Sequence, residues 1–217
     1  MGHKAKPKLL RLNTCEDWDN IWFVSKKDTA RFIKEDFEIR KFLDSQLSRY
    51  SVSEIKINRT IEKLMIVIKS ARTGIVLGKN GENVNRITKE VAEKFGYYVN
   101  IHVVEEKSPD TSPDLIAQNI ANQLEKRIPF RRAMKQAIQQ AMKSGAKGIK
   151  ITCSGRLGGV EIARSETYMD GSCPLHTFRA KVKRSNKTAR TIYGAIGISV
   201  LVNMGNYYPK LLPNSKN

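Results

Sequence analysis

The sequence is poor in the residues that build metal sites and disulfide frameworks. Its 217 residues include three cysteines and three histidines, which lie far apart and form no C-x-x-C pair. Zinc sites and disulfide-rich folds both need such residues at close, regular spacing. We therefore expect no metal ion, no other cofactor and no disulfide, and free thiols are typical of a reducing compartment.

Long apolar runs are also missing. No stretch approaches the roughly 18 apolar residues that a membrane-spanning helix needs. No apolar segment typical of a secretory signal follows the basic N-terminus. The sequence therefore predicts a cytoplasmic protein without a membrane partner.

Acidic residues are scarce in the second half of the chain. Residues 127–190 contain 15 basic and 3 acidic side chains, a net charge of +12 out of the chain's +18. A solvated surface normally mixes both signs. This region is therefore predicted to bind a polyanion, with nucleic acid as the first choice and an acidic membrane surface as the alternative.

The patterns of nucleotide-dependent and metal-dependent enzymes are absent as well. The phosphate-binding motif G-x-x-x-x-G-K-[ST] does not occur. Metal-dependent cleavage of nucleic acid needs clustered carboxylates that hold ions about 4 Å apart, and the basic half has too few acids for that. The sequence predicts no enzyme and no catalytic residue.

A glycine turn is the most informative feature that is present. Gly78, Lys79, Asn80 and Gly81 follow an apolar triplet and precede an amphipathic helix. Glycine takes backbone angles that are closed to other residues, so a sugar-phosphate backbone can approach the turn closely. Lys79 adds positive charge, and the start of the helix offers free N–H groups. We predict that these four residues clamp RNA.

The context of this turn strengthens the prediction, because a lone G-x-x-G is weak. Hydrophobic periodicity predicts a helix at 28–50, strands at 53–57 and 61–69, a helix after the clamp that ends at Gly96, and a strand at 97–104. This order matches the type II KH nucleic-acid module. Trp18, Ile21, Trp22 and Phe23 are expected to fold back on it as core.

The predicted fold is α+β, with two domains. A basic arm (1–16) precedes a KH domain of three strands with helices (17–106), and a C-terminal α+β RNA-binding domain with an irregular tail follows (107–217). In this last domain two helices are expected to cover a four-stranded antiparallel sheet. Its predicted elements are helices at 113–127 and 129–141 and strands at 149–153, 160–168, 175–182 and 192–202.

The cationic side chains provide the remaining candidate sites. Arg131, Arg132 and Lys135 point away from the apolar stripe of their helix and form an exposed ridge. The others suit a broad footprint on folded RNA, whose base edges lie in a narrow groove. The predicted ribosomal RNA contacts are Lys4, Lys6, Lys8, Arg11, Lys147, Lys150, Arg156, Arg164, Arg179, Lys181, Lys183, Arg184, Lys187 and Arg190.

Five segments resemble one family: residues 154–164 (SGRLGGVEIAR), 129–135, 145–150, 174–177 with Arg179, and 71–79. They are similar to the bacterial-type form of the third protein of the small ribosomal subunit. The resemblance implies a protein of the subunit head that binds small-subunit ribosomal RNA and lines the tunnel by which messenger RNA enters. It also implies that small-subunit proteins ten and fourteen are neighbours, with proteins two, four and five nearby.

The resemblance further implies that Arg131, Arg132 and Lys135 grip incoming messenger and assist its unwinding. Some positions depart from the family pattern, namely Thr167, Met169 and Ser172, and the added cations Lys181 and Lys183. Residues 8–13 also lack the glycines that the family usually has there.

A free KH-type RNA chaperone or a transcription-associated RNA-binding factor is the alternative. Against it, about a hundred residues lie beyond the KH pattern. A cytoplasmic ribosome is expected, and an organellar ribosome remains open.

Overall fold

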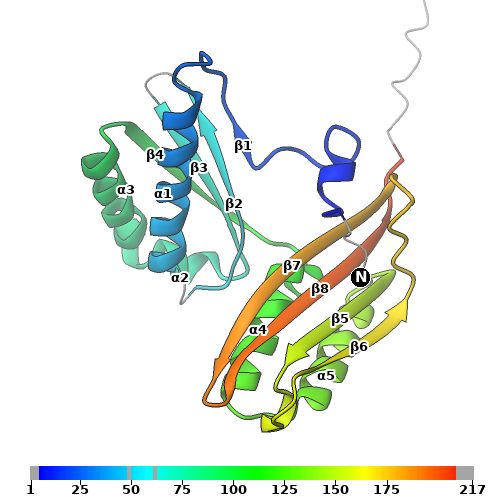
Figure 1. The fold of residues 1–217 in the computed structure, drawn as a ribbon. Helices are drawn as coiled ribbons and strands as arrows, with labels where there is room; N and C mark the ends of the chain where they lie inside the picture. Colours follow the sequence, from blue (N-terminus) through cyan, green and yellow to red (C-terminus); the bar gives the residue numbers. More distant parts are fainter. Residues whose placement is uncertain (1–4, 48–49, 61–62, 209–217) are drawn as a thin grey trace, which may run out of the picture. The chain divides into compact units, whose positions relative to one another are not determined.

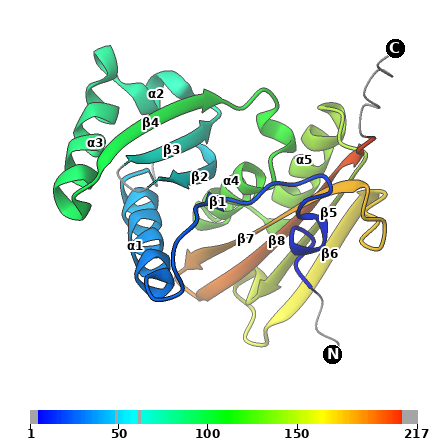
Figure 2. The same cartoon turned by 90° about the horizontal axis from the view of Figure 1, so that it is seen from above.

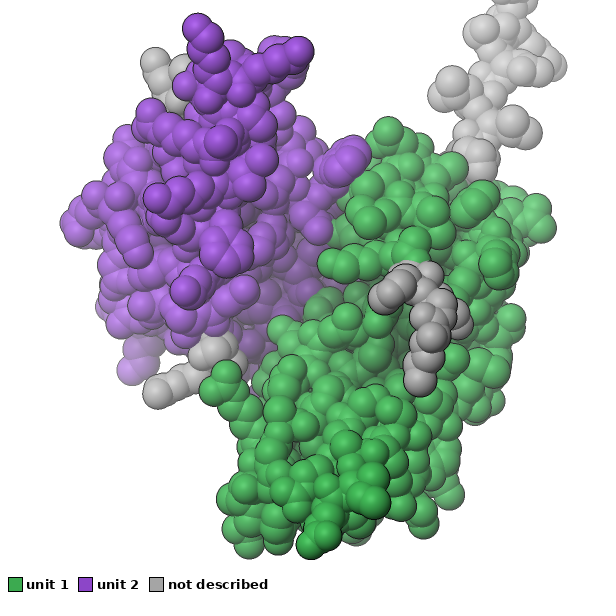
Figure 3. All heavy atoms as spheres, viewed as in Figure 1, with its two compact units in different colours: residues 1–17, 110–217 green, residues 18–109 purple. Residues whose placement is uncertain are grey.

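The computed structural model describes residues 5–47, 50–60 and 63–208, and of Asn80 the backbone alone. The chain divides into two compact units, residues 18–109 and residues 1–17 together with 110–217 (Figure 3). Each unit has its own hydrophobic core. We refer to them as the KH unit and the C-terminal unit.

The KH unit contains a four-stranded sheet in the order β1-β2-β3-β4 (Figure 1). β2 and β3 are antiparallel, whereas β3 and β4 are parallel, as are β1 and β2. The elements are β1 (Asn20–Ile21), α1 (Thr29–Leu47), β2 (Val52–Arg59), β3 (Lys63–Ser70), α2 (Thr73–Leu77), η2 (Lys79–Gly81), α3 (Glu82–Phe95) and β4 (Tyr98–Glu105). The predicted order of helices and strands is confirmed.

The predicted end of the first strand of this unit is wrong. The strand predicted to end at residue 57 continues through Asn58 and Arg59, which pair with β3 as the end of β2. The sequence analysis also missed β1, because two residues are too few to show a strand period. The part of the predicted second strand at residues 61–62 lies outside the described residues.

The core of the KH unit follows from periodicity. α1 buries Ile39 and Leu43, and α3 buries Ile87 and Val91. Both helices share one cluster with the alternate residues of β2 and β3, of which Ile57 and Ile66 are paired partners. Since directly paired residues point to the same face of a sheet, both helices cover one face.

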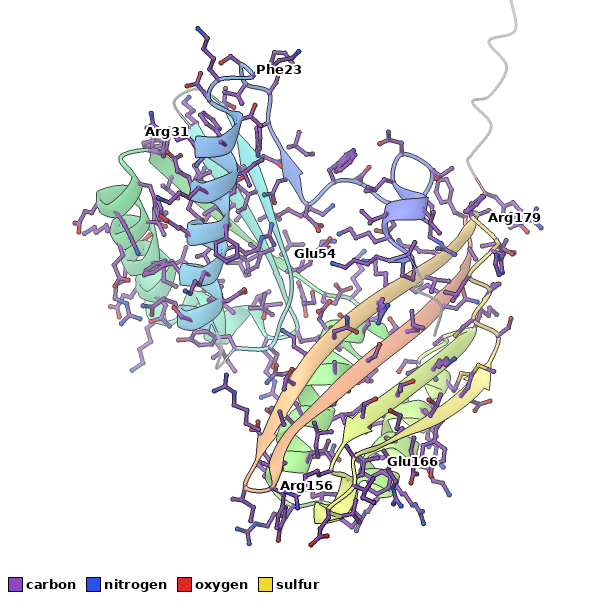
Figure 4. All side chains as sticks on the ribbon, in the orientation of Figure 1. Phe23, Arg31, Glu54, Arg156, Glu166 and Arg179 are labelled. Carbon is purple, nitrogen blue, oxygen red and sulfur yellow. The ribbon has the colours of Figure 1, made fainter. Side chains whose placement is uncertain are left out.

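The predicted burial of the apolar cluster near residue 20 is largely wrong. Trp22 packs against Phe32, with ring centroids 5.7 Å apart. Trp18 and Ile21 are each 54% exposed and Phe23 is 99% exposed, and Figure 4 shows Phe23 at the outside of the unit. The physical reason is that β1 is very short and lies at the sheet edge, so the side chains around it have no facing layer.

The C-terminal unit has the predicted architecture of two helices on a four-stranded antiparallel sheet. The strand order is β6-β5-β8-β7, and Figures 1 and 2 show α4 and α5 together on one face. The elements are η1 (Leu9–Arg11), α4 (Pro113–Glu125), α5 (Phe130–Lys143), β5 (Gly148–Gly155), η4 (Leu157–Gly159), β6 (Arg164–Gly171), β7 (Ala180–Thr191) and β8 (Gly194–Asn206), with η3 (Pro109–Thr111) at the junction of the units.

Several strand boundaries in this unit differ from the prediction. Residues 160–163, 175–179 and 192–193 are not in strands, and β7 runs on to Thr191. β7 and β8 form one long hairpin whose register closes at Thr191 and Gly194. The added part of β7 is mostly polar and shows no alternation, so its strand conformation depends on pairing with the apolar β8.

The N-terminal segment packs on the C-terminal unit through Arg11. This side chain is fully buried. Its Nε donates to the Ala180 carbonyl, its Nη1 to the Pro7 carbonyl and its Nη2 to three further carbonyls, those of Pro174, Leu175 and Thr177, at 3.1–3.2 Å. The prediction that Arg11 contacts ribosomal RNA is wrong, because its guanidinium bonds to backbone carbonyls inside the unit.

Candidate RNA interface

The glycine turn has the backbone that its sequence requires. Gly78 caps the end of α2 at φ 72° and Gly81 caps the start of α3 at φ 78°. A Cβ on Gly78 would lie 2.6 Å from Nδ2 of Asn83, so a larger residue would clash as well as be strained. The Asn83 amide in turn donates to the Ile75 carbonyl at 3.4 Å. The turn is therefore fixed between the two helices.

The surroundings of the turn suit a nucleic-acid strand. Lys79 is exposed within it, and the 14-residue helix α3 begins directly after Gly81. Ile75 and Leu77 are 51% and 40% exposed on the preceding helix. Free N–H groups and a cation suit phosphate, and exposed apolar side chains suit bases.

The predicted cationic ridge lies on the exposed face of α5. Arg131, Arg132 and Lys135 are all exposed, whereas Ala133 and Met134 between them are fully buried. The helix is thus anchored on one side and presents three long cations on the other. This agrees with the orientation predicted from the period of 3.6 residues.

One carboxylate lies beside this ridge. Nη2 of Arg131 is 3.7 Å from Oε1 of Glu166, and Nη2 of Arg164 is 3.2 Å from the same oxygen. Figure 4 shows Glu166 at the end of the unit that also carries Arg156. Because one acid faces two arginines that are 64% and 48% exposed, the cluster keeps excess positive charge.

The other predicted cations are spread over the C-terminal unit. On β7, Lys183 is paired with the buried Val202 and so points to the helix-covered face, whereas Arg184 is paired with Leu201 and points to the other face. Arg179 lies at the opposite end of the unit from Arg156 (Figure 4). They therefore do not form one continuous patch.

Exposure separates these candidates further. Lys6, Lys147, Arg164, Arg179, Arg184, Lys187 and Arg190 are exposed, while Lys8, Lys150, Arg156, Lys181 and Lys183 are partly buried. Lys4 lies outside the described residues. The exposed group is the better placed to contact phosphates.

The sequence analysis missed an apolar groove beside α1. It encloses about 560 Å³ and is lined by Trp18, Asn20, Ile21, Trp22, Ile33, Asp36, Phe37 and Arg40. Ile33 and Phe37 are 57% and 66% exposed. They form a second apolar pair at i, i+4, away from the buried Ile39 and Leu43, and this spacing was the signal that could have revealed the groove.

The polar side chains that line the α1 groove bond mainly to neighbours within the KH unit. Oδ2 of Asp36 accepts from Trp22 Nε1 at 2.7 Å and from Asn20 at 2.9 Å. Arg40 donates to the Ile55 carbonyl at 2.9 Å. The groove therefore offers mainly apolar walls to a partner.

A buried charge cluster stands next to this groove. The guanidinium of Arg59 lies 4.6 Å from the Phe32 ring centroid and 4.8 Å from that of Tyr97. Its Nη1 is 3.0 Å from Glu35 Oε2. Burial alone would raise the pKa of Glu35, but hydrogen bonds from Arg31 and Tyr97 and the charge of Arg59 outweigh it and lower that pKa. These contacts connect α1 with Arg59 of β2 and with Tyr97 inside the KH unit.

The cysteines do not form a chemical centre. All three are free, and burial, aided by the nearby Glu166, raises the pKa of the Cys153 thiol to about 11. No group of three or more potential metal ligands occurs among the residues that the structure describes. In the same residues, no helix is both long enough and apolar enough to cross a membrane.

The KH-like unit with its glycine turn and the basic α+β unit together define an RNA-binding protein. A family model for the KH domain matches residues 38–111, and one described as "Ribosomal protein S3, C-terminal domain" matches residues 120–202.

Curated relatives extend this similarity to nearly the whole chain. Small ribosomal subunit protein uS3 of Marinobacter nauticus is 48% identical over 205 residues, which cover 94% of this chain and 90% of the relative. The uS3 proteins of a Sulfurovum species and of Anaplasma phagocytophilum are 49% and 46% identical, over 97% and 95% of this chain and 90% and 97% of the relatives. The chain belongs to the small ribosomal subunit protein uS3 family.

Membership of this family confirms the resemblance seen in the sequence. The protein is a structural constituent of the small ribosomal subunit, with small-subunit ribosomal RNA and ribosomal proteins as its partners. The family is not one of enzymes, so the prediction of no enzymatic activity is confirmed. A ribosomal role is favoured over the free RNA chaperone.

Proposed function

We propose that this protein lines the tunnel by which messenger RNA enters the small subunit and helps to keep the incoming strand unpaired. The observation that carries the proposal is the ridge of α5, where Arg131, Arg132 and Lys135 are exposed on a helix whose opposite face is buried. Long cations on a rigid support can hold successive phosphates of one strand.

The proposed mechanism is passive. When a base pair at the entrance opens thermally, the ridge binds the phosphates of the strand that has been released. Reclosing then requires those contacts to break, so each opening is harder to reverse. This needs no nucleotide hydrolysis, in agreement with the absent phosphate-binding motif.

The test is the variant with Arg131, Arg132 and Lys135 all changed to Ala. We expect near-normal subunit assembly and near-normal translation of unstructured messages, but slower translation of messages with stable hairpins. The matched control changes the exposed Gln136, Gln139 and Gln140 of the same helix to Ala. An equal effect of the triple cation variant on both kinds of message would refute the role.

We further propose that the clamp at Gly78, Lys79, Asn80 and Gly81 and the exposed cations of the C-terminal unit bind ribosomal RNA of the subunit head. This proposal is supported by the positive φ of Gly78 and Gly81 and by the excess of basic residues in the chain. The ribosome in question is proposed to be cytoplasmic.

Small-subunit proteins ten and fourteen are the proposed protein neighbours, with two, four and five nearby. The α1 groove supports a protein contact, because residues 18–44 of the KH unit contain six acids and six bases in a chain of net charge +18. An apolar surface without excess positive charge suits a protein better than RNA. Changing Ile33 and Phe37 to Ser should weaken binding of purified proteins ten and fourteen without altering RNA affinity.

A further inference from the structure

Apolar side chains gather at one end of the C-terminal unit, where two loops meet. Ile162 is 83% exposed and Ile192 is 73% exposed, with Tyr193 at 51% and Val160 at 39%. Single exposed apolar residues are common on protein surfaces, but a contiguous group marks an interaction site. We call Val160, Ile162, Ile192 and Tyr193 the hairpin-tip surface.

The two loops are tied together by Arg156. Its Nε donates to the Val160 carbonyl at 2.8 Å and its Nη1 to the Tyr193 carbonyl at 3.0 Å. Because the cation holds both carbonyls, the β7–β8 turn and the η4 loop form one surface. Arg156 was predicted as an RNA contact, and in the structure its guanidinium also joins the two loops.

The Tyr193 ring lies against a glycine. Three of its carbons would lie 3.1–3.3 Å from a Cβ placed on Gly159. A Cβ there would crowd the ring, and Gly159 also has a φ of 83°, which strains other residues. The ring is thus supported by backbone while about half of the side chain stays exposed. Leu157, which is fully buried, anchors the same loop in the core.

The hairpin-tip surface is continuous with the cationic ridge. Arg164, at the start of β6, is paired with Gly155, the residue before Arg156. It shares the Glu166 carboxylate with Arg131 of the ridge. Figure 4 shows Arg156 and Glu166 at this end of the unit and Arg179 at the other. Residues 156–164 and 188–195 together carry a net charge of +2.

We propose that the hairpin-tip surface binds unpaired messenger RNA, with bases packed on Tyr193, Ile162 and Ile192 and phosphates held by Arg164 and Arg190. Stacking on aromatic side chains beside arginines is how proteins hold single strands without reading their sequence. The identity of the strand rests on the proposed role at the messenger entrance, because the tip extends the same ridge.

A single strand fits this chemistry better than the other partners. A duplex keeps its bases stacked inside, so four exposed apolar side chains would meet only sugars and phosphates. A basic protein neighbour is disfavoured by the positive charge around the patch, in contrast to the balanced charge of residues 18–44 around the α1 groove.

The first test measures binding by the full-length protein. The probes are a fluorescein-labelled oligouridylate of twelve nucleotides and an RNA duplex of the same length. Changing Ile192 to Ser and Tyr193 to Ala should weaken binding of the single strand about fivefold or more. Affinity for the duplex and the slope of affinity against salt should not change, since no cation is lost.

Two further variants complete this test. Ile162→Ser alters the patch from the other loop, so it answers the question even if the hairpin variant folds poorly. Phe178→Ser is the matched control, because this side chain is also exposed, at 55%, and lies just before the opposite end of β7. Unchanged single-strand affinity in the folded tip variants, or an equal loss with Phe178→Ser, overturns the proposal.

The second test identifies the strand in assembled subunits. A messenger with 4-thiouridine at successive positions downstream of the decoding site is irradiated, and the crosslinked peptides are identified by mass spectrometry. We expect peptides from the η4 loop or the β7–β8 turn. Messenger crosslinks to other peptides of this protein or to its neighbours, with none to these two loops, overturn the assignment.

The two proposals fail separately. If the Arg131, Arg132 and Lys135 variant slows structured messages while the tip variants bind single strands normally, only the hairpin-tip proposal is wrong. If that variant slows translation of structured and unstructured messages equally, while the tip peptides crosslink to messenger, the unwinding role is wrong. The tip then remains a messenger contact.

Discussion

The two units use charge in opposite ways. The KH unit, residues 18–109, has 17 basic and 13 acidic residues, whereas the C-terminal unit, residues 1–17 with 110–217, has 22 and 8. In the KH unit several cations pair inside the fold, as Arg59 does with Glu35 and Lys69 with Glu54, both at 3.0 Å. Charge there supports structure, and a glycine turn provides the RNA contact.

In the described part of the C-terminal unit, Glu166 pairs with two largely exposed arginines, Arg131 and Arg164. The core of this unit consists of apolar residues of α4, α5 and the inner strands, and its cations stand mostly on the surface. The comparison teaches that net charge alone does not locate an RNA site. What matters is whether the acids that could neutralise the cations lie beside them.

The largest expected effect breaks the charge cluster of the KH unit. Arg59→Leu leaves Glu35 and Asp36 without their buried cation, and should lower the free energy of unfolding by about 3–5 kcal/mol. Denaturant unfolding of the full chain, followed by tryptophan fluorescence, measures this, since Trp22 packs near the cluster.

Arg31→Leu is the matched control for this change. Arg31 bonds to the same Glu35 carboxylate at 2.8 Å, but its side chain is 71% exposed. Exposed pairs contribute little to stability, because water screens them, so this variant should lose much less than Arg59→Leu. A similar loss in both variants would mean that burial of Arg59 is not what matters.

The second prediction concerns salt. If about six phosphates are contacted, the affinity of the full chain for small-subunit ribosomal RNA should fall about 10³-fold between 50 and 200 mM salt. Changing Arg179 and Arg184 to Gln should reduce the slope by about one unit each. Filter binding across a salt series measures both.

The matched pair for this experiment lies on α1. Arg31 and Lys34 face Glu35 and Glu38 at 2.8 and 4.0 Å, so changing them to Gln should leave the slope unchanged. If the affinity does not depend on salt, or if the α1 pair changes the slope equally, then the exposed cations of the C-terminal unit are not the main phosphate contacts.

The third prediction tests the clamp. Lys79→Asp with Asn80→Asp changes the charge of the turn by three units and should weaken single-strand RNA binding by the full chain about tenfold, or about 1.4 kcal/mol. The fold should stay intact, because neither residue belongs to the apolar pattern. Circular dichroism and oligonucleotide titration check the two parts.

Lys26→Asp with Lys27→Asn is the control for the clamp. It makes the same change of charge at exposed residues of the same unit, where no glycine turn exists. If both variants lose the same affinity, the clamp acts through charge alone and its backbone geometry is irrelevant.

Features that follow from local sequence patterns were predicted better than features that depend on contacts between residues far apart in the sequence. The stripe of α5 placed Arg131 on the exposed face, and the G-x-x-G predicted the turn at Gly78 and Gly81 before α3. The burial of Arg11 was unpredictable, because four of its five partner carbonyls lie more than 160 residues away in the sequence and a basic N-terminus resembles a solvated arm.

For apolar residues the error was the opposite one, because exposed side chains were predicted to be buried. Phe23 and Trp18 look like core by composition, and only the shortness of β1 shows why they stay exposed. The hairpin tip was missed for a related reason, since Ile192 and Tyr193 continue an apolar run that reads as strand. Sequence reveals which side chains are apolar, but the topology decides which of them find a partner.

The smallest expected effect concerns the pH dependence of the KH unit. The pKa of Glu35 is lowered from the ordinary value of 4.5, so its charged form stabilises the fold above that value. This stabilisation is lost as the pH falls through the lower pKa of the folded state. The difference in unfolding free energy between the wild type and Glu35→Gln should therefore be largest above about pH 5 and shrink below pH 4.5.

Glu38→Gln, which removes a carboxylate that is 45% exposed on the same helix, should differ little from the wild type at any pH. A Glu35→Gln difference that stays constant down to pH about 3 would show that the Arg59 cluster does not favour the charged carboxylate, and the contrast between a unit that pairs its charges and one that displays them would lose its main support.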